Sequence, residues 1–388
     1  MPSDAPVFPE AEFRTRTARL QHAMAAQEID ALLLTMPADI FYVSGFLTRF
    51  WESPARPWFV VVPASGPPKA VIPAIGAALM GQSWIADIRT WQAPDPSDDG
   101  VSLLAEAIGE TVPARGTLAA PMGLETHIRM PFRDLQRLIE RLAPRRLVDG
   151  TEVVQRTREI KSDAEIEKLR AICTITGAAF ARLAGQSLQG RPLNAVFAEF
   201  QALLLHQGAD WVSYVAGAAG PDGYADVIAP ATATPLARGD VLMLDAGAVK
   251  DGYFSDFDRN FFLGPPKEEV RRVQEALWQA TEEALGALRP GMRACDAHRI
   301  LADGLRRHGV RPCTGRLGHG LGVTLTEWPS FTPLDRTELR ENMVLTLEPS
   351  AHTGDESFLV HEENIVLRAN GPELLSPRAP RHGFEMGA

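Results

Sequence analysis

The sequence contains few cysteines and no long apolar run. Its 388 residues include only Cys173, Cys295 and Cys313, an odd number at wide spacings. This argues against both a disulfide framework and a CxxC metal site. No run approaches the ~18 apolar residues of a membrane span. The first residues lack the basic start and apolar core of a signal peptide, so we expect a cytoplasmic protein without membrane partners.

A basic surface is also missing. Acidic residues outnumber basic ones by 49 to 39, and no Lys/Arg cluster is long enough to follow a phosphate backbone, so nucleic acid is not an expected partner. The length exceeds the roughly 100–200 residues that one domain usually organises, which predicts two domains.

The N-terminal half is typical of an α/β domain, which we place at residues 1–155. Short apolar runs at 31–35, 40–46 and 58–63 are bounded by Pro, Gly or Asp and predict buried strands. A helical pattern covers 12–27, and the proline-rich stretch 93–100 predicts a surface loop.

A second domain, at residues 156–388, begins near a capping-box pattern. Ser162 and Glu165 precede apolar residues at helical spacing, which predicts a long helix. Further helical patterns alternate with strand-like runs, which favours an α+β domain with a largely antiparallel sheet. The helices are predicted near 192–207, 267–288 and 294–308, and the strands at 240–247, 252–264, 342–350 and 357–367.

The strand-like runs carry carboxylates among apolar residues. Alternation puts Asp256 and Asp258 on one face of their strand, and a hairpin would bring Asp245 beside Asp256. Glu348 ends a third run and Glu362 lies inside a fourth. Each alone is as compatible with a strand end or turn. Several sharing one buried site would need compensation by cations.

Two divalent ions would balance four carboxylates, and the imidazole of His319 would complete an oxygen-rich site. Mn²⁺, Co²⁺, Fe²⁺ and Zn²⁺ all suit such donors. Two adjacent metal ions can share a hydroxide and polarise a carbonyl, which is what amide hydrolysis requires. A structural histidine in a glycine-rich turn remains the alternative for His319.

These pieces together carry a family resemblance. TREIKSDAEIEKLR (157–170), LDAG, GYFSDFDRNF, GHGLG, LTLEPS and HEENIVL resemble the creatinase/prolidase/aminopeptidase P superfamily, metallopeptidase family M24. The resemblance implies a pita-bread catalytic domain, preceded by a smaller α/β domain like that of creatinase and prolidase. It also implies a homodimer and a set of metal ligands, which fall on Asp245, Asp256, His319, Glu348 and Glu362.

The resemblance gives Glu348 a second role, in handling the proton of the attacking water. Glu363 remains a competitor for the role of Glu362, because Val360 to Glu363 stand where the family reads Arg-Ile-Glu-Asp. Asp258 stands where the family reads threonine. It could orient a metal ligand, receive a cationic group of the substrate, or be a solvated carboxylate paired with Arg259.

Auxiliary histidines of the family's peptidases are absent. Thr326, Gly315 and a position at or near Ile228 stand in their places. His352 is a candidate replacement as a catalytic group beside Thr326, and a surface imidazole is its alternative. In the loop 47–58, Arg49, Trp51 and Arg56 could shape substrate choice, or simply belong to a packed loop.

The leading hypothesis is a dinuclear metal-dependent hydrolase of an amide C–N bond, similar to Xaa-Pro dipeptidase or aminopeptidase P. Its substrate would be a small peptide or a derivative of an amino acid. The competing enzyme hypothesis is a small-molecule member, like ectoine hydrolase, creatinase or a dimethylsulfoniopropionate lyase. A non-enzymatic pita-bread binding module is disfavoured, because such proteins typically lose metal ligands and all five are present here.

Overall fold

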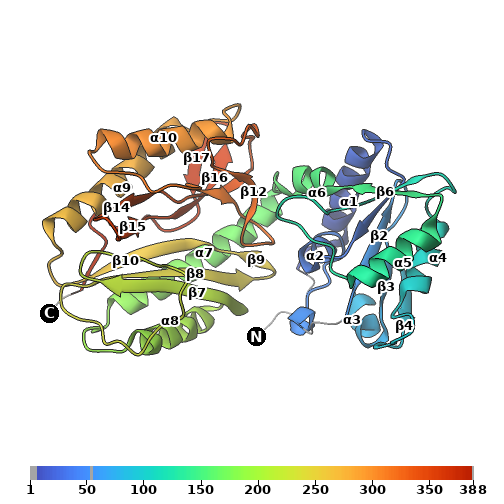
Figure 1. Ribbon diagram of the computed structural model, residues 1–388, viewed down its shortest axis with the longest axis horizontal. Coiled ribbons are helices and arrows are strands. Elements are labelled where there is room, and N and C mark those ends of the chain that lie inside the picture. The colour runs from blue at the N-terminus through green and yellow to red at the C-terminus, as the bar shows by residue number, and fades with distance from the viewer. Residues whose placement is uncertain (1–6, 53–55, 387–388) are drawn as a thin grey trace. The chain divides into compact units, whose positions relative to one another are not determined.

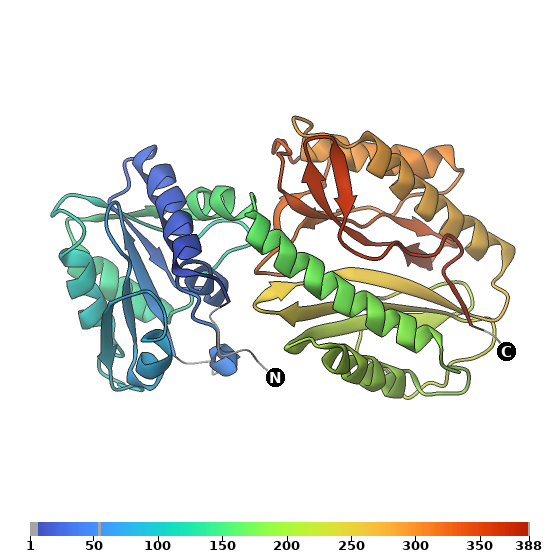
Figure 2. The ribbon, with the colours of Figure 1, turned by 180° about the vertical axis from the view of Figure 1, so that it is seen from behind.

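The computed structural model describes residues 7–52 and 56–386 (Figure 1). The chain divides into two compact units, Met1–Arg158 and Glu159–Ala388. Both combine helices with sheets, as the sequence predicts (Figure 2).

The N-terminal unit holds one sheet with the strand order β4-β3-β2-β1-β5-β6. Its strands are β1 (Ala31–Leu34), β2 (Phe59–Pro63), β3 (Lys69–Pro73), β4 (Asp87–Trp91), β5 (Thr117–Ala120) and β6 (Arg146–Asp149). Its helices are α1 (Glu10–Ala25), α2 (Pro37–Ser44), α3 (Ala77–Met80), α4 (Val101–Gly109), α5 (Phe132–Leu142) and α6 (Thr151–Arg158), with the 3-10 turns η1 (Arg49–Glu52) and η2 (Ala74–Gly76).

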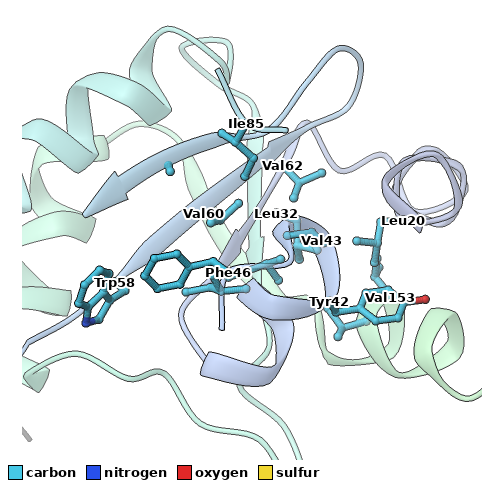
Figure 3. Packing of buried hydrophobic residues seen from close by; sticks show 14 of the residues in the cluster. Leu20, Leu32, Tyr42, Val43, Phe46, Trp58, Val60, Val62, Ile85 and Val153 are labelled. Atoms are coloured by element: carbon cyan, nitrogen blue, oxygen red, sulfur yellow. The ribbon is translucent and has the colours of Figure 1, made fainter. Parts of the chain in front are cut away.

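Both faces of this sheet are covered, which explains why its central strands are apolar throughout. On one face, Leu32 and Val60 pack with residues of α1, α2 and α6 (Figure 3). On the other face, Leu33 and Val61 pack with residues of α4 and α5. The two buried faces confirm strands at 31–35 and 58–63.

The predicted strand at 40–46 is wrong, because this segment belongs mostly to helix α2. Pro37 occupies the first turn, where its missing N–H costs nothing, and Gly45 ends the helix with a φ of 77°. A short apolar run cannot distinguish a buried strand from a buried helix by its periodicity. Here the flanking proline and glycine mark the helix ends.

The C-terminal unit contains two larger sheets and a two-stranded ribbon. One sheet has the order β18-β10-β8-β7, with β9 also on β8, the second has the order β12-β11-β13-β16-β17, and the ribbon is β14-β15. The first sheet and the ribbon use β7 (Trp211–Gly220), β8 (Val241–Lys250), β9 (Tyr253–Phe254), β10 (Phe257–Leu263), β14 (Ser350–His352), β15 (Phe358–Val360) and β18 (Phe384–Met386). The second sheet uses β11 (His319–Gly320), β12 (Glu327–Ser330), β13 (Val344–Leu347), β16 (Glu363–Arg368) and β17 (Gly371–Leu374).

Four long helices flank these sheets, and they are α7 (Asp163–Ala184), α8 (Leu193–Gln207), α9 (Glu268–Ala287) and α10 (Ala294–Arg307). Figure 2 shows α7 running across the first sheet, whereas α9 and α10 lie beside the second. The predicted capping box is confirmed, since Ser162 accepts from the Glu165 N–H and the Glu165 side chain accepts from the Ser162 N–H. No helix in the described ranges is long and apolar enough to cross a membrane.

Hydrogen bonds join the two sheets where their acidic residues lie. The Asp256 N–H donates to Asn364 Oδ1 at 3.1 Å, and Asn364 Nδ2 donates to the Asp256 carbonyl. The guanidinium of Arg259 donates to Glu363 Oε2 at 2.9 Å. The two halves of the acidic constellation are therefore held together by buried polar contacts as well as by apolar packing.

Candidate metal centre

The first half of the site lies on an antiparallel strand pair. Asp245 lies in β8, and Asp256 directly precedes β10, whose Asp258 is paired in register with Asp245. The side chain of Tyr214, from the neighbouring strand β7, spans the two aspartates. Its hydroxyl lies 2.8 Å from Asp245 Oδ2 and 2.6 Å from Asp256 Oδ1. A phenol has a single proton, so the Tyr214 hydroxyl can donate to only one of the two aspartates at any moment.

The second half contributes the imidazole. His319 Nδ1 lies 2.8 Å from the Gly320 carbonyl, which makes Nδ1 the protonated nitrogen and leaves the lone pair on Nε2. Nε2 lies 3.3 Å from Asp256 Oδ2 and 3.9 Å from Glu348 Oε2. Gly320 is required beside the histidine, because a Cβ there would lie 2.1 Å from the Trp328 carbonyl oxygen.

Neighbouring residues Glu362 and Glu363 have different surroundings. Glu363 accepts from Arg259, Arg378, Ser376 and the Ala379 N–H, so its charge is compensated by the protein. Glu362 lies in the break between β15 and β16, and its Oε1 is buried without a hydrogen-bond partner among the described residues.

The structure brings Asp256, His319 and Glu362 together, with their ligating atoms within 4.8 Å of one another. Glu348 is adjacent to His319, and its side chain is 31% exposed, so this carboxylate is partly accessible to solvent. Asp245 joins the group through Tyr214.

The electrostatics of this group fit bound cations. Burial and the charge of Asp256 raise the pKa of Asp245 to about 7. Burial raises the pKa of Asp256 to about 7 despite the opposing charge of Arg316. Burial also raises the pKa of Glu348 to about 7 and that of Glu362 well above its ordinary value. Charge-bearing groups are crowded here without enough protein cations to balance them.

The donor atoms of the site also suit bound metal ions. Asp245 Oδ1 and Glu362 Oε1 are buried with no donor from the described part of the chain, and burial lowers the pKa of His319, which favours its neutral form. Buried oxygens without donors beside a neutral imidazole nitrogen are suited to hard or borderline divalent metal ions.

The three positions that lack the auxiliary histidines carry no imidazole themselves, and the imidazole of His298 hydrogen-bonds the backbone of Gly315. Thr326 is half-buried and its carbonyl accepts from Thr324 Oγ1 at 2.9 Å. Gly315 is exposed, and Ile228 has an 85% exposed side chain. His352 ends β14 opposite Phe358 of β15. It is half-buried, and its Nδ1 is a buried atom with no hydrogen-bond partner within the described residues.

The loop 47–58 belongs to the N-terminal unit, and its residues 53–55 lie outside the described residues. Trp51 packs edge-on against Phe46 and Trp58 in the hydrophobic core. Arg49 pairs with Glu52 on the surface, and the Arg56 guanidinium lies 5.3 Å from the centre of the Phe50 ring.

Tyr214 and Asn364 are the site residues that the sequence analysis missed. Tyr214 lies outside the quoted motifs, whereas Asn364 lies in HEENIVL directly after Glu363. The pairing of Tyr214 with Gly247 in the β7–β8 register places it next to the aspartates, and this register is not visible in the local sequence. The polar hydroxyl in an apolar strand was the available signal.

Comparison with known proteins agrees with this architecture. The model of metallopeptidase family M24 matches residues 167–369, and that of the creatinase/prolidase N-terminal domain matches 16–160. The Xaa-Pro dipeptidase of Pyrococcus furiosus is 24% identical over 94% of this chain and 98% of its own length. The probable dipeptidase PepE of Mycobacterium tuberculosis is 27% identical over 92% of this chain and 93% of its own.

Solved structures share the fold over nearly the whole chain. Dipeptidase PepE from Mycobacterium ulcerans aligns with a TM-score of 0.84 and 26% identity, covering 98% of this chain and 99% of that one. Prolidase from Thermococcus sibiricus also gives a TM-score of 0.84, with 24% identity over 94% of this chain and 97% of its own. The pita-bread fold, the preceding creatinase-like domain and a requirement for divalent metal follow, and the chain belongs to metallopeptidase family M24.

Proposed function

We propose that the protein is a dinuclear metal-dependent hydrolase that cleaves the amide bond before proline in dipeptides or short peptides. The relatives named Xaa-Pro dipeptidase and prolidase support this substrate class. The observation that carries the proposal is the buried cluster of Asp256, His319 and Glu362, whose ligating atoms lie within 4.8 Å of one another and in which Glu362 Oε1 has no hydrogen-bond partner among the described residues. Mn²⁺ is the first metal to test, with Co²⁺, Fe²⁺ and Zn²⁺ as alternatives, and the homodimer is part of the proposal.

The proposed ligands are Asp245, Asp256, His319, Glu348 and Glu362. Two divalent ions held by them would supply a nucleophile from water at neutral pH and would polarise the substrate carbonyl. The chain itself does the positioning. The Gly320 carbonyl fixes which nitrogen of His319 faces the carboxylates, and the Tyr214 hydroxyl holds the two aspartates at a fixed separation.

Glu348 has the second role of moving a proton. Its side chain is the accessible one beside the buried His319, so it can take a proton from an attacking water at its Oε atoms and return it to the leaving nitrogen. A carboxylate beside metal ions can fill such a general-base role.

A second candidate function rests on the three positions without histidine. Gly315, Thr326 and the exposed Ile228 offer no imidazole to hold a peptide carbonyl or to protonate a leaving amine. That observation favours a smaller amide or amidine derived from an amino acid as the alternative substrate.

Proline release from a panel of Xaa-Pro dipeptides and tripeptides by the Mn²⁺-loaded protein tests the proposal. We expect release by the native protein and a loss of at least about 100-fold in kcat for Glu348→Gln. The matched control is Glu356→Gln, which makes the same change at an exposed turn residue. Absence of proline release from metal-loaded native protein would reject the peptide substrate and leave the small amides and amidines.

A further inference from the structure

Asp258 is a buried carboxylate that the proposed five ligands do not account for. Its side chain lies in β10 with the residue only 2% exposed. Both carboxylate oxygens are closed to solvent, and no hydrogen-bond donor from the described residues reaches either of them. An uncompensated buried carboxylate is costly, so proteins keep one only where something else balances it.

The adjacent arginine makes no hydrogen bond with this carboxylate. The side chain of Arg259 points to the opposite face of β10, where it donates to Glu363 Oε2 and to the Glu362 carbonyl. Its contact with Asp258 is with the backbone carbonyl of that residue, at 2.6 Å. The pairing of the Asp258 carboxylate with Arg259, one of the three alternatives left open by the sequence, is therefore excluded.

Asp258 lies among the proposed metal ligands. It is directly opposite Asp245 across the β8–β10 ladder, two strands that run side by side in Figure 1. Directly opposed residues on one face of such a pair have Cβ atoms about 4.5–5.5 Å apart. The negative charge of Asp245 acts on Asp258 and is opposed by the positive charge of Arg259, and the charge of Asp258 in turn acts on Glu362.

Burial also argues against contact with substrate. A group that receives a cationic part of a substrate must be reachable from solvent, as Glu348 partly is. The oxygens of Asp258 are not reachable in this way. A partner that is itself bound inside the site, between the carboxylates, fits the burial of Asp258.

We propose that Asp258 is an additional carboxylate ligand of the metal centre, beside Asp245. This inference rests on the proposed metal centre and extends its donor set to one imidazole and five carboxylates: Asp245, Asp256, Asp258, Glu348 and Glu362. An additional oxygen donor favours ions that accept six ligands, such as Mn²⁺, over Zn²⁺, which prefers four. The centre with two divalent ions would carry one net negative charge.

Metal binding of four purified proteins tests the inference. They are the native protein, Asp258→Asn, Asp258→Thr and the surface control Asp355→Asn, which changes an exposed residue. Each is stripped with a chelator and titrated with Mn²⁺ and Zn²⁺, and the bound metal is measured by elemental analysis. Thermal unfolding of the metal-free and Mn²⁺-loaded forms shows whether the variants fold.

We expect Asp258→Thr to lower the affinity for Mn²⁺ by more than the about 10–100-fold that is typical of residues that only orient ligands, with a smaller loss for Zn²⁺, and Asp258→Asn to lower it less, because the amide oxygen can still coordinate. The metal-free variants should unfold at the same temperature as the metal-free native protein or higher, because a repelling charge has been removed. Asp355→Asn should match the native protein throughout.

Two outcomes would overturn the inference, and they differ in what else they reject. Native protein that binds two Mn²⁺ ions together with an unchanged affinity in both Asp258 variants would reject Asp258 as a ligand and leave the proposed function intact. Native protein that binds no divalent ion would reject the metal centre and Asp258 with it.

Discussion

The buried carboxylates on the two faces of strand β10 have different surroundings. On one face, Arg259 meets Glu363, a carboxylate that also accepts from Arg378, Ser376 and a backbone N–H. On the other face, Asp258 and the nearby Asp245 have buried oxygens with no donor from the described residues. The same strand thus shows that this fold can neutralise a buried acid by itself.

The neighbouring carboxylates Glu363 and Glu362 have pKa values shifted in opposite directions. Glu363 is balanced by the protein, and its pKa is lowered below its ordinary value by Arg259, His361 and Arg378, which together outweigh burial. Glu362, the next residue along the chain, has its pKa raised well above the ordinary value by burial and by neighbouring carboxylates. A carboxylate like Glu363 is balanced by cationic groups of the protein, whereas a carboxylate like Glu362 needs an added cation.

The largest effect on this comparison should come from removing the arginine. Arg259→Met removes the buried ion pair between Arg259 and Glu363. Breaking such a pair by removing one partner typically lowers the free energy of unfolding by about 3–5 kcal/mol. We expect this loss in the free energy of unfolding, measured by urea denaturation, to be equal with Mn²⁺ and with a chelator. A loss confined to the metal-loaded form would mean that Arg259 supports metal binding and not the stability of the protein itself.

A smaller and opposite pattern is expected for Tyr214→Phe. The variant removes the hydroxyl that spans Asp245 Oδ2 and Asp256 Oδ1. Loss of a group that orients ligands lowers metal affinity by about 10–100-fold, and we expect this in a Mn²⁺ titration. The metal-free stability should change little, because the phenyl ring retains the packing. Equal affinities for the variant and the native protein would show that the aspartates need no such support.

The smallest effect should follow from Ser376→Ala, which removes one of several donors to Glu363 and the acceptor of the Asn364 N–H. A hydrogen bond to a charged group contributes about 1.5 kcal/mol, and we expect a loss of that size in the free energy of unfolding at pH 7. Metal affinity should equal that of the native protein, as measured by the same titration. A reduced metal affinity would mean that the two faces of β10 are coupled.

Much of the fold was predictable because its signals are local. Ser162 and Glu165 form the predicted capping box. The alternating run at 252–264 was predicted as one strand, and it forms β9 and β10 with a break at residues 255–256, where Asp256 lies. The segment 357–367 was predicted as one strand, but it breaks at residues 361–362 between β15 and β16. That break separates the surroundings of Glu362 and Glu363, which the sequence left as competitors.

The site residues that the sequence did not predict reach the site through long-range pairing. Tyr214 reaches the aspartates through the register of β7 on β8, and Asn364 reaches Asp256 across two sheets. A strand register follows from the packing of the whole sheet and is only weakly encoded in any short segment. The residues with chemical functions were therefore easier to recognise than those that hold them in place.

The side chain of Asn364 imitates a neighbouring strand. It accepts from the N–H of Asp256 and donates to the carbonyl of the same residue, as a backbone partner in a ladder would. The two sheets therefore cannot part at this point without breaking both bonds. The amide proton of Asp256 should therefore exchange with solvent as slowly as those of the core strands.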